Sequence, residues 1–151
     1  MKDTITIVTG GSHGIGRCIA EFLAEKGGNI AIFDVVDGTD SVDAVRSKGV
    51  NADFFNVDVS SLKAVESGVE DVLKKMGEIN NLINNAGINI SMEDRAPIHE
   101  FPDEMWEKII HVDLNGVYYC SKAVLKYMTQ NGYGKIINIS SIVGVCLLYT
   151  S

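Results

Sequence analysis

With 151 residues, of which 46% are hydrophobic and 22% charged, the chain has the composition of one globular domain with a buried core. Its formal net charge of −7 and its lack of any long Lys or Arg run argue against a nucleic-acid or anionic-membrane partner. Cys18, Cys120 and Cys146 are too far apart in sequence for a metal-binding pair or a disulfide framework, so we expect no metal site and a cytoplasmic location.

Apolar runs alternate with helical patterns along the chain. The apolar runs predict strands at residues 4–9, 29–34, 52–57, 81–84 and 135–139. Spaced apolar residues predict helices at residues 15–26 and 40–48, a third from its N-cap Ser60 to Met76, and a long one at residues 103–130. This alternation indicates a single α/β domain whose parallel sheet carries helices on both faces. Neither a signal-peptide pattern nor an apolar run of membrane-spanning length is present, so we expect no membrane partner.

The first predicted strand runs into a glycine-rich turn, with Thr-Gly-Gly-Ser-His-Gly-Ile-Gly over residues 9–16. Glycine lets the backbone turn tightly and approach a pyrophosphate with no Cβ in the way. The following helix N-terminus offers N–H donors and positive partial charge to the phosphates. The alternative is a tight turn with no ligand. We predict cofactor contacts from Gly10, Ser12, His13, Gly14, Ile15 and Gly16.

Asp34 ends the second predicted strand, beside the glycine-rich turn. A carboxylate there can accept hydrogen bonds from the adenosine ribose hydroxyls of a dinucleotide, and it would repel a 2′-phosphate. No Arg or Lys occurs at residues 11–13 or 35–38 to bind such a phosphate. The sequence therefore favours NAD over NADP. The alternative is an ordinary solvated aspartate at a strand end.

The fourth predicted strand ends in Asn84-Asn85-Ala86-Gly87. Small residues at the carboxyl end of a strand suit a ligand that lies close to the backbone. Asparagines that only tie loops together are the structural alternative.

These motifs together resemble the classical short-chain dehydrogenase/reductase family, whose loop is Thr-Gly-x-x-x-Gly-Ile-Gly. The resemblance runs from about residue 4 to residue 144 and includes Ile-Asn-Ile-Ser-Ser at residues 137–141. It implies a Rossmann-type doubly wound parallel sheet of order 3-2-1-4-5. It also implies that Asn85, Ala86 and Gly87 line the ribose and nicotinamide side of the cofactor, and that Asp58 and Val59 lie at the adenine.

The activity implied by the resemblance is hydride transfer between NAD(H) and a secondary alcohol or ketone. The substrate would be an acyl chain, a sugar or a steroid-like molecule, with 3-oxoacyl reduction as the leading specific hypothesis. The protein would be a homo-oligomer, a dimer or a tetramer. The alternative is a non-catalytic protein that binds NAD and senses its redox state.

Two residues match the catalytic positions of the family. Ser141, or alternatively Ser140, matches the serine whose hydroxyl holds the substrate oxygen, although two hydroxyls at a strand end can simply cap it. Asp113 stands where the family usually has an asparagine that supports a water relay, and a carboxylate accepts but cannot donate as an amide does. Asp113 is expected to keep part of the relay role or to bend the helix.

The family's Tyr-x-x-x-Lys motif should follow Ser141 by about a dozen residues, and no such motif follows Ser141 in this sequence. Tyr118 and Lys122 have this spacing but lie in the long helix, so we interpret the match as chance. Residues 146–151 match a reading frame of the transposase mosaic-end adapter used in DNA library preparation. We therefore expect an N-terminal fragment comprising a truncated domain at residues 1–145 and a non-native tail at residues 146–151. Its last strand would form an open edge. Apolar side chains on the long helix would face water, among them Val117, Tyr118, Val124, Leu125 and Met128.

Overall fold

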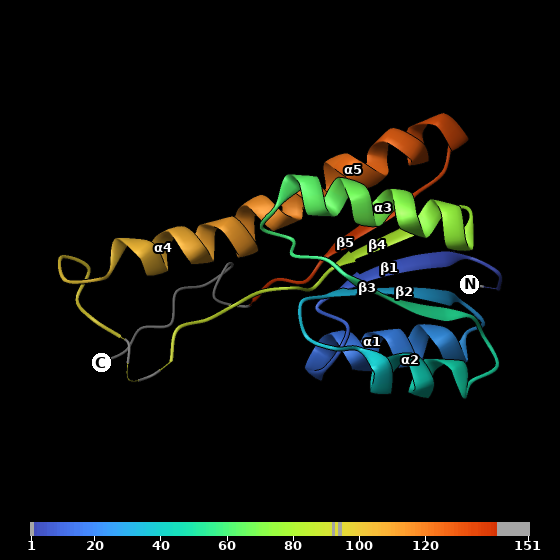
Figure 1. Ribbon diagram of the computed structural model, residues 1–151, viewed down its shortest axis with the longest axis horizontal. Coiled ribbons are helices and arrows are strands. Elements are labelled where there is room, and N and C mark those ends of the chain that lie inside the picture. The colour runs from blue at the N-terminus through green and yellow to red at the C-terminus, as the bar shows by residue number, and fades with distance from the viewer. Residues whose placement is uncertain (1, 92, 94, 142–151) are drawn as a thin grey trace.

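A computed structural model describes residues 2–91, 93 and 95–141 of the chain (Figure 1). The strands are β1 (Ile5–Thr9), β2 (Asn29–Asp34), β3 (Ala52–Asn56), β4 (Asn81–Asn84) and β5 (Lys135–Asn138). The helices are α1 (Gly14–Glu25), α2 (Thr39–Arg46), α3 (Leu62–Met76), α4 (Asp103–Ile109), the π-helical segment η1 (Ile110–Asn115) and α5 (Gly116–Asn131).

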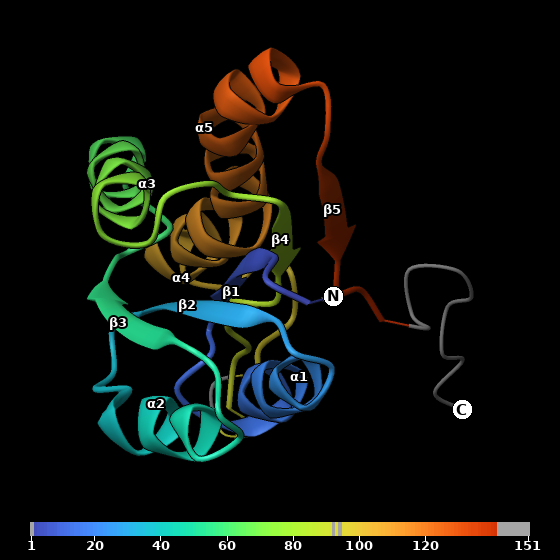
Figure 2. The ribbon, with the colours of Figure 1, turned by 90° about the vertical axis from the view of Figure 1, so that its right-hand side faces the viewer.

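All strands run parallel in one sheet of order β3-β2-β1-β4-β5. Figure 2 shows α1 and α2 on one face of this sheet and α3 and α5 on the other. The predicted Rossmann-type doubly wound fold and its strand order are confirmed.

The central strands are mostly apolar because both of their faces are covered by helices. Ile7 of β1 lies opposite Ala31 of β2 and Leu82 of β4, and all three side chains are fully buried. Since the strands are parallel and in register, their carboxyl ends meet at one edge of the sheet. The predicted site residues of the first, second and fourth strands therefore lie close together.

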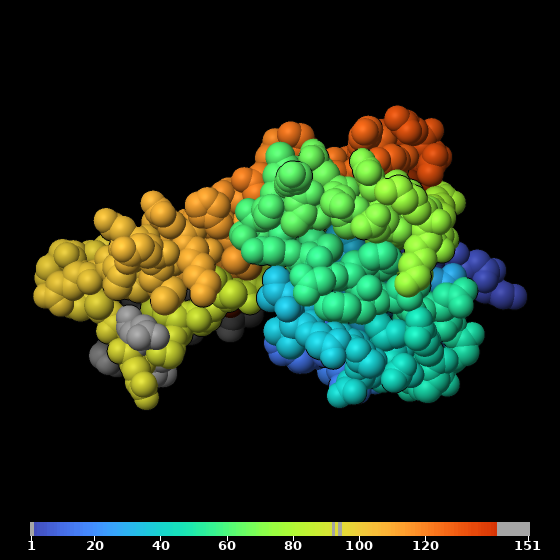
Figure 3. Space-filling view, in the orientation of Figure 1, coloured from blue at the N-terminus to red at the C-terminus, as the bar shows by residue number. Residues whose placement is uncertain are grey.

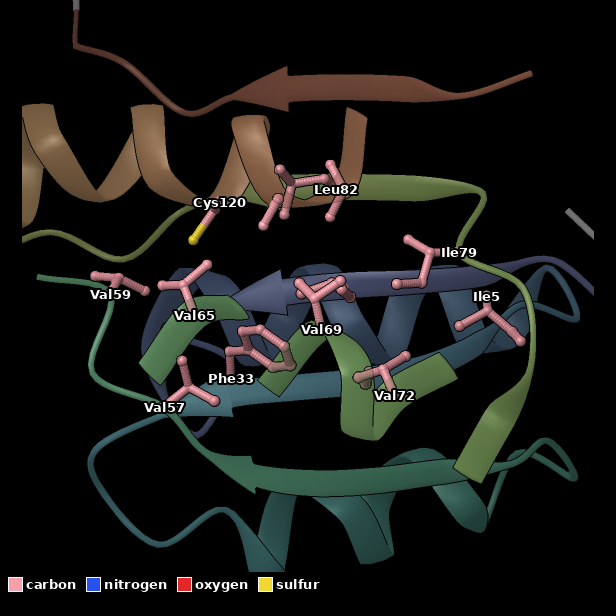
Figure 4. Packing of buried hydrophobic residues seen from close by; sticks show 14 of the residues in the cluster. Ile5, Phe33, Val57, Val59, Val65, Val69, Val72, Ile79, Leu82 and Cys120 are labelled. Carbon is pink, nitrogen blue, oxygen red and sulfur yellow. The ribbon is translucent and has the colours of Figure 1, made fainter. Parts of the chain in front are cut away.

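Two hydrophobic clusters hold the helices against the sheet. The larger lies beneath α3 and α5 and contains Phe33, Val65, Val69, Leu82 and Cys120, which Figure 4 shows pointing toward one another. The smaller lies beneath α1 and α2 and contains Val8, Ala20, Ile32, Val45 and Ile83. Packing on both faces fixes the ends of the strands, from which the loops of the site extend.

The N-terminus of α3 differs from the sequence-based prediction by one residue. Ser61, not Ser60, is the N-cap, and its hydroxyl oxygen accepts a hydrogen bond from the backbone N–H of Ala64 at 3.3 Å. The hydroxyl of Ser60 instead donates to the carboxylate of Asp58 at 2.7 Å. Two adjacent serines offer the same capping chemistry, so sequence alone did not separate them.

The long helix predicted at residues 103–130 is present, but its middle is wider than an α-helix. The six residues of η1 form π-helical turns between α4 and α5, and such turns occur frequently at functional sites. Figure 3 shows α4 and its preceding loop projecting from the rest of the molecule as an arm. None of the helices in the described part of the chain is long and apolar enough to cross a membrane.

The strand β5 forms one edge of the sheet, where β4 is its neighbour. Ile137 is 52% exposed, and on α5 the side chains of Tyr118 and Leu125 are 58% and 43% exposed. Within the described residues, β5 thus pairs on one side only, as expected for an open edge. The expectation that Val124 and Met128 face water is wrong, because both are buried in the larger cluster.

Candidate functional site

The carboxyl ends of β1, β2 and β4 open into one cleft of about 610 Å³. One wall comes from the loops that follow these strands, and the other from α4 and η1. In a doubly wound sheet, ligands bind at this edge, where the chain connections diverge to opposite faces. The predicted cofactor residues that line the cleft are Gly10, His13, Asp34, Asp58, Val59, Ala86 and Gly87.

The turn between β1 and α1 can be built only with glycine at key positions. Gly10 and Gly14 have φ values of +64° and +56°, which side-chain-bearing residues rarely adopt. A Cβ at Gly16 would collide with the carbonyl oxygen of Gly10 and with Asn85 Nδ2. The first turn of α1 carries no acidic residue, so its N–H groups and positive dipole end suit an anion.

Asp34 is held in a fixed orientation by the backbone. Its Oδ2 accepts a hydrogen bond from the N–H of Ser12 at 3.0 Å, and its Oδ1 accepts one from the N–H of Val36 at 3.1 Å. The residue is 7% exposed and lines the cleft. Each carboxylate oxygen can accept further hydrogen bonds, so Asp34 can still bind hydroxyl groups in the cleft.

The side chain of Asn85 braces the glycine-rich turn. Its Nδ2 donates to the carbonyl oxygens of Thr9 at 3.0 Å and Gly10 at 3.1 Å. The Thr9 hydroxyl oxygen in turn accepts the backbone N–H groups of Asn85 at 3.0 Å and Ala86 at 2.9 Å. Thr9 was part of the sequence motif but received no predicted role. These bonds join the ends of β1 and β4, which leaves Ala86 and Gly87 to face the cleft.

Asn84 plays a structural part at the same edge. Its Nδ2 donates to Asn138 Oδ1 at 2.8 Å and to the Ser121 hydroxyl at 3.2 Å, which ties β4 to β5 and α5. The carbonyl oxygen of Asn84 also accepts the N–H of Ile139 at 2.9 Å. The exposed residue Ser141 follows shortly after this bond. The structure therefore brings the predicted catalytic serine to the edge of the sheet that carries the cleft.

Asp113 lies in η1 and holds the chain that follows β4. Its Oδ1 accepts a hydrogen bond from the backbone N–H of Ile88 at 2.9 Å, and a Cβ on Gly87 would lie 3.6 Å from the same oxygen. A carboxylate fulfils this acceptor role as well as an amide oxygen does. Sequence reasoning missed the contact because it spans 25 positions.

Asp58 and Val59, which follow β3, line the part of the cleft next to that strand. Asp58 Oδ1 accepts the N–H of Ser60 at 2.9 Å as well as its hydroxyl, which turns the chain toward α3. Val59 is 7% exposed and packs against Gly116 at the start of α5, where a Cβ would lie 3.0 Å from Val59 Cγ2. This close approach sets the width of the cleft between the sheet and the long helix.

Cys120 of α5 lies in the larger hydrophobic cluster. Burial raises the pKa of the Cys120 thiol to about 12, so it is protonated and unreactive at neutral pH. Within residues 2–91, 93 and 95–141, no three His, Cys, Asp or Glu side chains gather as metal ligands would. The predicted domain boundary at residue 145 and the predicted non-native tail at residues 146–151 lie outside the described residues.

A family model described as short chain dehydrogenase matches residues 4–149. Cis-4-hydroxycyclohexanecarboxylate dehydrogenase of Sinomonas cyclohexanicum is 37% identical over 143 residues, which cover 94% of this chain and 56% of that protein. 2-Dehydro-3-deoxy-L-rhamnonate dehydrogenase (NAD(+)) of a Sphingomonas species is 33% identical over 138 residues, covering 91% of this chain and 53% of that protein.

Among solved structures, NAD+-bound xylitol dehydrogenase superposes with a TM-score of 0.91 at 32% identity. The match covers 97% of this chain and 56% of the xylitol dehydrogenase chain. The chain thus spans about half the length of the relatives that it matches.

Proposed function

The chain belongs to the short-chain dehydrogenase family, and from that premise we propose that it binds NAD(H) in the cleft and serves hydride transfer to or from a secondary alcohol or ketone. The observation that carries this proposal is the pairing of the glycine turn with a fixed Asp34 carboxylate at one edge of the sheet. One of the relatives named above carries NAD in its name, and the xylitol dehydrogenase structure has NAD+ bound.

The proposed cofactor lies along the carboxyl ends of the strands. Its phosphates would bind the turn and the N-terminus of α1, through Gly10, Ser12, His13, Gly14, Ile15 and Gly16. Asp34 would accept the adenosine ribose hydroxyls, and Asp58 and Val59 would border the adenine. Ala86 and Gly87 would lie against the other ribose and the nicotinamide, with the side chain of Asn85 holding them in place.

Preference for NAD follows from the charges in the cleft. Among the described residues, the cleft is lined by the carboxylates of Asp34, Asp58, Glu104 and Glu107 and by one lysine, Lys108. A 2′-phosphate beside Asp34 would bring two negative groups together in a partly buried site, which is electrostatically unfavourable.

At the reacting end, the chain supplies positioning groups. The bound nicotinamide would supply the hydride or accept it. Ser141 would hold the substrate oxygen by a hydrogen bond, and Asp113 would fix the segment at Ile88 that borders the nicotinamide. The sequence holds no Tyr-x-x-x-Lys motif after Ser141 to exchange the proton of that oxygen. We therefore expect the 151-residue chain to bind NAD without turnover, since a general acid/base typically contributes ~10²–10⁴-fold in rate.

For the substrate, we propose a secondary alcohol or ketone on a small polar molecule. The relatives above are named for a cyclic hydroxy acid, a sugar acid and a sugar alcohol, which favours such molecules over the 3-oxoacyl chains considered first. Loops beyond β5 in the longer relatives would complete the choice.

The proposal is tested by calorimetric titration of the chain with NAD and with NADP. We expect NAD to bind at least tenfold more tightly, and Asp34→Ser to reduce this ratio by loss of the repelling charge. Val36→Ala, which leaves the backbone N–H in place and adds no hydrogen-bond donor, is the matched control and should keep the ratio. No binding of NAD, or tighter binding of NADP by the unmodified chain, would contradict the proposal.

A further inference from the structure

Ser41 of α2 is a fully buried polar residue that lies outside the cleft. The other two buried residues of this helix are valines. The Ser41 hydroxyl donates a hydrogen bond to the carbonyl oxygen of Gly11 at 2.8 Å, across 30 positions of the sequence. Ser47, at the end of α2, instead donates to a carbonyl oxygen three residues earlier, which is a common pattern for helix serines. Ser41 thus connects α2 with the glycine-rich turn.

The peptide unit between Gly11 and Ser12 is held at both of its ends. The carbonyl oxygen of Gly11 accepts from Ser41, and the N–H of Ser12 donates to Asp34 Oδ2 at 3.0 Å. In a trans peptide these two groups point in opposite directions, so the two bonds together fix the rotation of the peptide plane. A rotated peptide would lose both bonds and turn a carbonyl oxygen toward the Asp34 carboxylate, which has no hydrogen to donate to it.

The surroundings of Gly11 are closely packed. A Cβ at Gly11 would lie 3.1 Å from Ile32 Cγ2 and 3.1 Å from the carbonyl oxygen of Val8. Gly11, Ser12 and Ser41 are all buried. Removal of the Ser41 hydroxyl would therefore leave the Gly11 carbonyl oxygen without a partner and away from solvent, which is costly and favours rotation of the peptide.

The start of α2 is placed tightly enough to make Ser41 a fixed support. A Cβ at Gly38 would lie 2.6 Å from the ring of Phe54 and 2.9 Å from Ser12 Oγ. Val45, one turn further along α2, belongs to the smaller hydrophobic cluster and is 0% exposed. Packing thus holds α2 against the sheet, and Ser41 adds the polar contact to the turn.

We propose that Ser41 is a positioning residue for the cofactor. By holding the Gly11–Ser12 peptide, it orients both the turn that would bind the phosphates and the Asp34 carboxylate that would bind the ribose. The inference rests on the proposed binding of NAD in the cleft. Because Ser41 lies outside the cleft, it acts on the cofactor through Gly11 and Ser12.

The test compares Ser41→Ala with Val45→Ala in calorimetric titrations with NAD, at a temperature at which each variant is fully folded. Val45 is equally buried on the same helix, but its side chain has no polar atom to hold the turn. We expect Ser41→Ala to bind NAD about five- to tenfold more weakly than the unmodified chain, as for one buried hydrogen bond lost. Val45→Ala should lose at least as much thermal stability and keep the dissociation constant within about twofold.

Amide hydrogen exchange at Ser12, measured by NMR without NAD, reports on the peptide itself. We expect exchange at this amide to be about five- to tenfold faster in Ser41→Ala and unchanged in Val45→Ala. Ser41→Cys keeps a weaker donor of similar size and should fall between Ser41→Ala and the unmodified chain in both measurements. It also replaces Ser41→Ala if that variant does not fold.

An unchanged dissociation constant in Ser41→Ala would overturn the inference, as would equal weakening of NAD binding in Ser41→Ala and Val45→Ala. Unchanged exchange at Ser12 in Ser41→Ala would overturn it as well. If the unmodified chain fails to bind NAD, it is the proposed function that is contradicted, and exchange at Ser12 alone then decides whether Ser41 holds the peptide.

Discussion

The β1–β3 part of the sheet and its β5 edge differ in how far their side chains are buried. On the closed side, β1–β3 with α1 and α2, the strands β1 and β2 are buried and the edge strand β3 is half-buried. Backbone N–H groups hold the Asp34 carboxylate there. On the open side, β5 with α5, only part of the apolar surface is buried, and Ile137 and Tyr118 are more than half exposed. The proposed phosphate and adenosine contacts lie on the closed side, and Ser141, the proposed substrate contact, follows β5 on the open side. The contrast teaches that the hydrogen bonds which orient Asp34 form between loops away from the edge strand β5.

We expect the largest difference between the two sides in the loss of unfolding free energy when one isoleucine on each side is replaced by alanine. Ile32 of β2 is 0% exposed and Ile137 of β5 is 52% exposed. We expect Ile32→Ala to lower the free energy of unfolding by about 2–5 kcal/mol, because it removes buried methyl groups and leaves a cavity. Ile137→Ala should cost less than about 1 kcal/mol.

Urea denaturation of the two variants measures both values in one experiment. Equal losses would mean that β5 is buried in solution, for example by self-association through the open edge. The comparison between the closed and open sides would then be wrong.

A second pair of substitutions probes the glycine turn on the closed side. Gly16→Ala places a Cβ against the Gly10 carbonyl oxygen and the side chain of Asn85, so the turn must shift. We expect a loss of about 1–3 kcal/mol in stability, as for overpacked cores, together with loss of NAD binding.

The control for this substitution is Gly14→Ala. A Cβ at Gly14 would meet nothing within 4 Å, and only its φ of +56° opposes a side chain. That strain costs about 1–2 kcal/mol. NAD binding that survives Gly16→Ala but is lost in Gly14→Ala would show that the close approach at Gly16 does not shape the site.

The smallest effect is expected where the two sides meet, at the hydrogen bond between Asp113 and Ile88. Asp113→Ala removes the acceptor and should cost about 1 kcal/mol in unfolding free energy, while Asp113→Asn keeps an oxygen there and should cost less than half as much. Thermal unfolding of the three proteins distinguishes these values. If Asn and Ala behave alike, the negative charge rather than the hydrogen bond is what Asp113 contributes.

Much of the closed side could be predicted from the sequence because its signals are local. The glycine turn and Asp34 lie within one strand–helix–strand unit, and their positions followed from strand and turn patterns alone. The fold and strand order came from the resemblance that these motifs carry. The roles of individual site residues in binding stay predictions.

The features that sequence reasoning missed depend on residues far apart or on small geometric differences. The hydroxyl of Thr9 meets the backbone of Asn85 and Ala86 across more than 70 positions, and no periodic pattern encodes that contact. The π-helical turns of η1 carry the same apolar spacing as an α-helix, so the pattern predicted one uniform helix. Burial of Val124 and Met128 depended on the rotation of α5 over the sheet.

Amide hydrogen exchange of the chain with and without NAD tests most directly whether the closed side binds the phosphates and the adenosine of the cofactor. The account predicts that NAD slows exchange at residues 10–17 and 34–36, where N–H groups face the phosphates or support Asp34. It predicts unchanged exchange at residues 135–139 of the open edge. Unchanged exchange in the glycine turn, or protection confined to β5 and the arm, would contradict it.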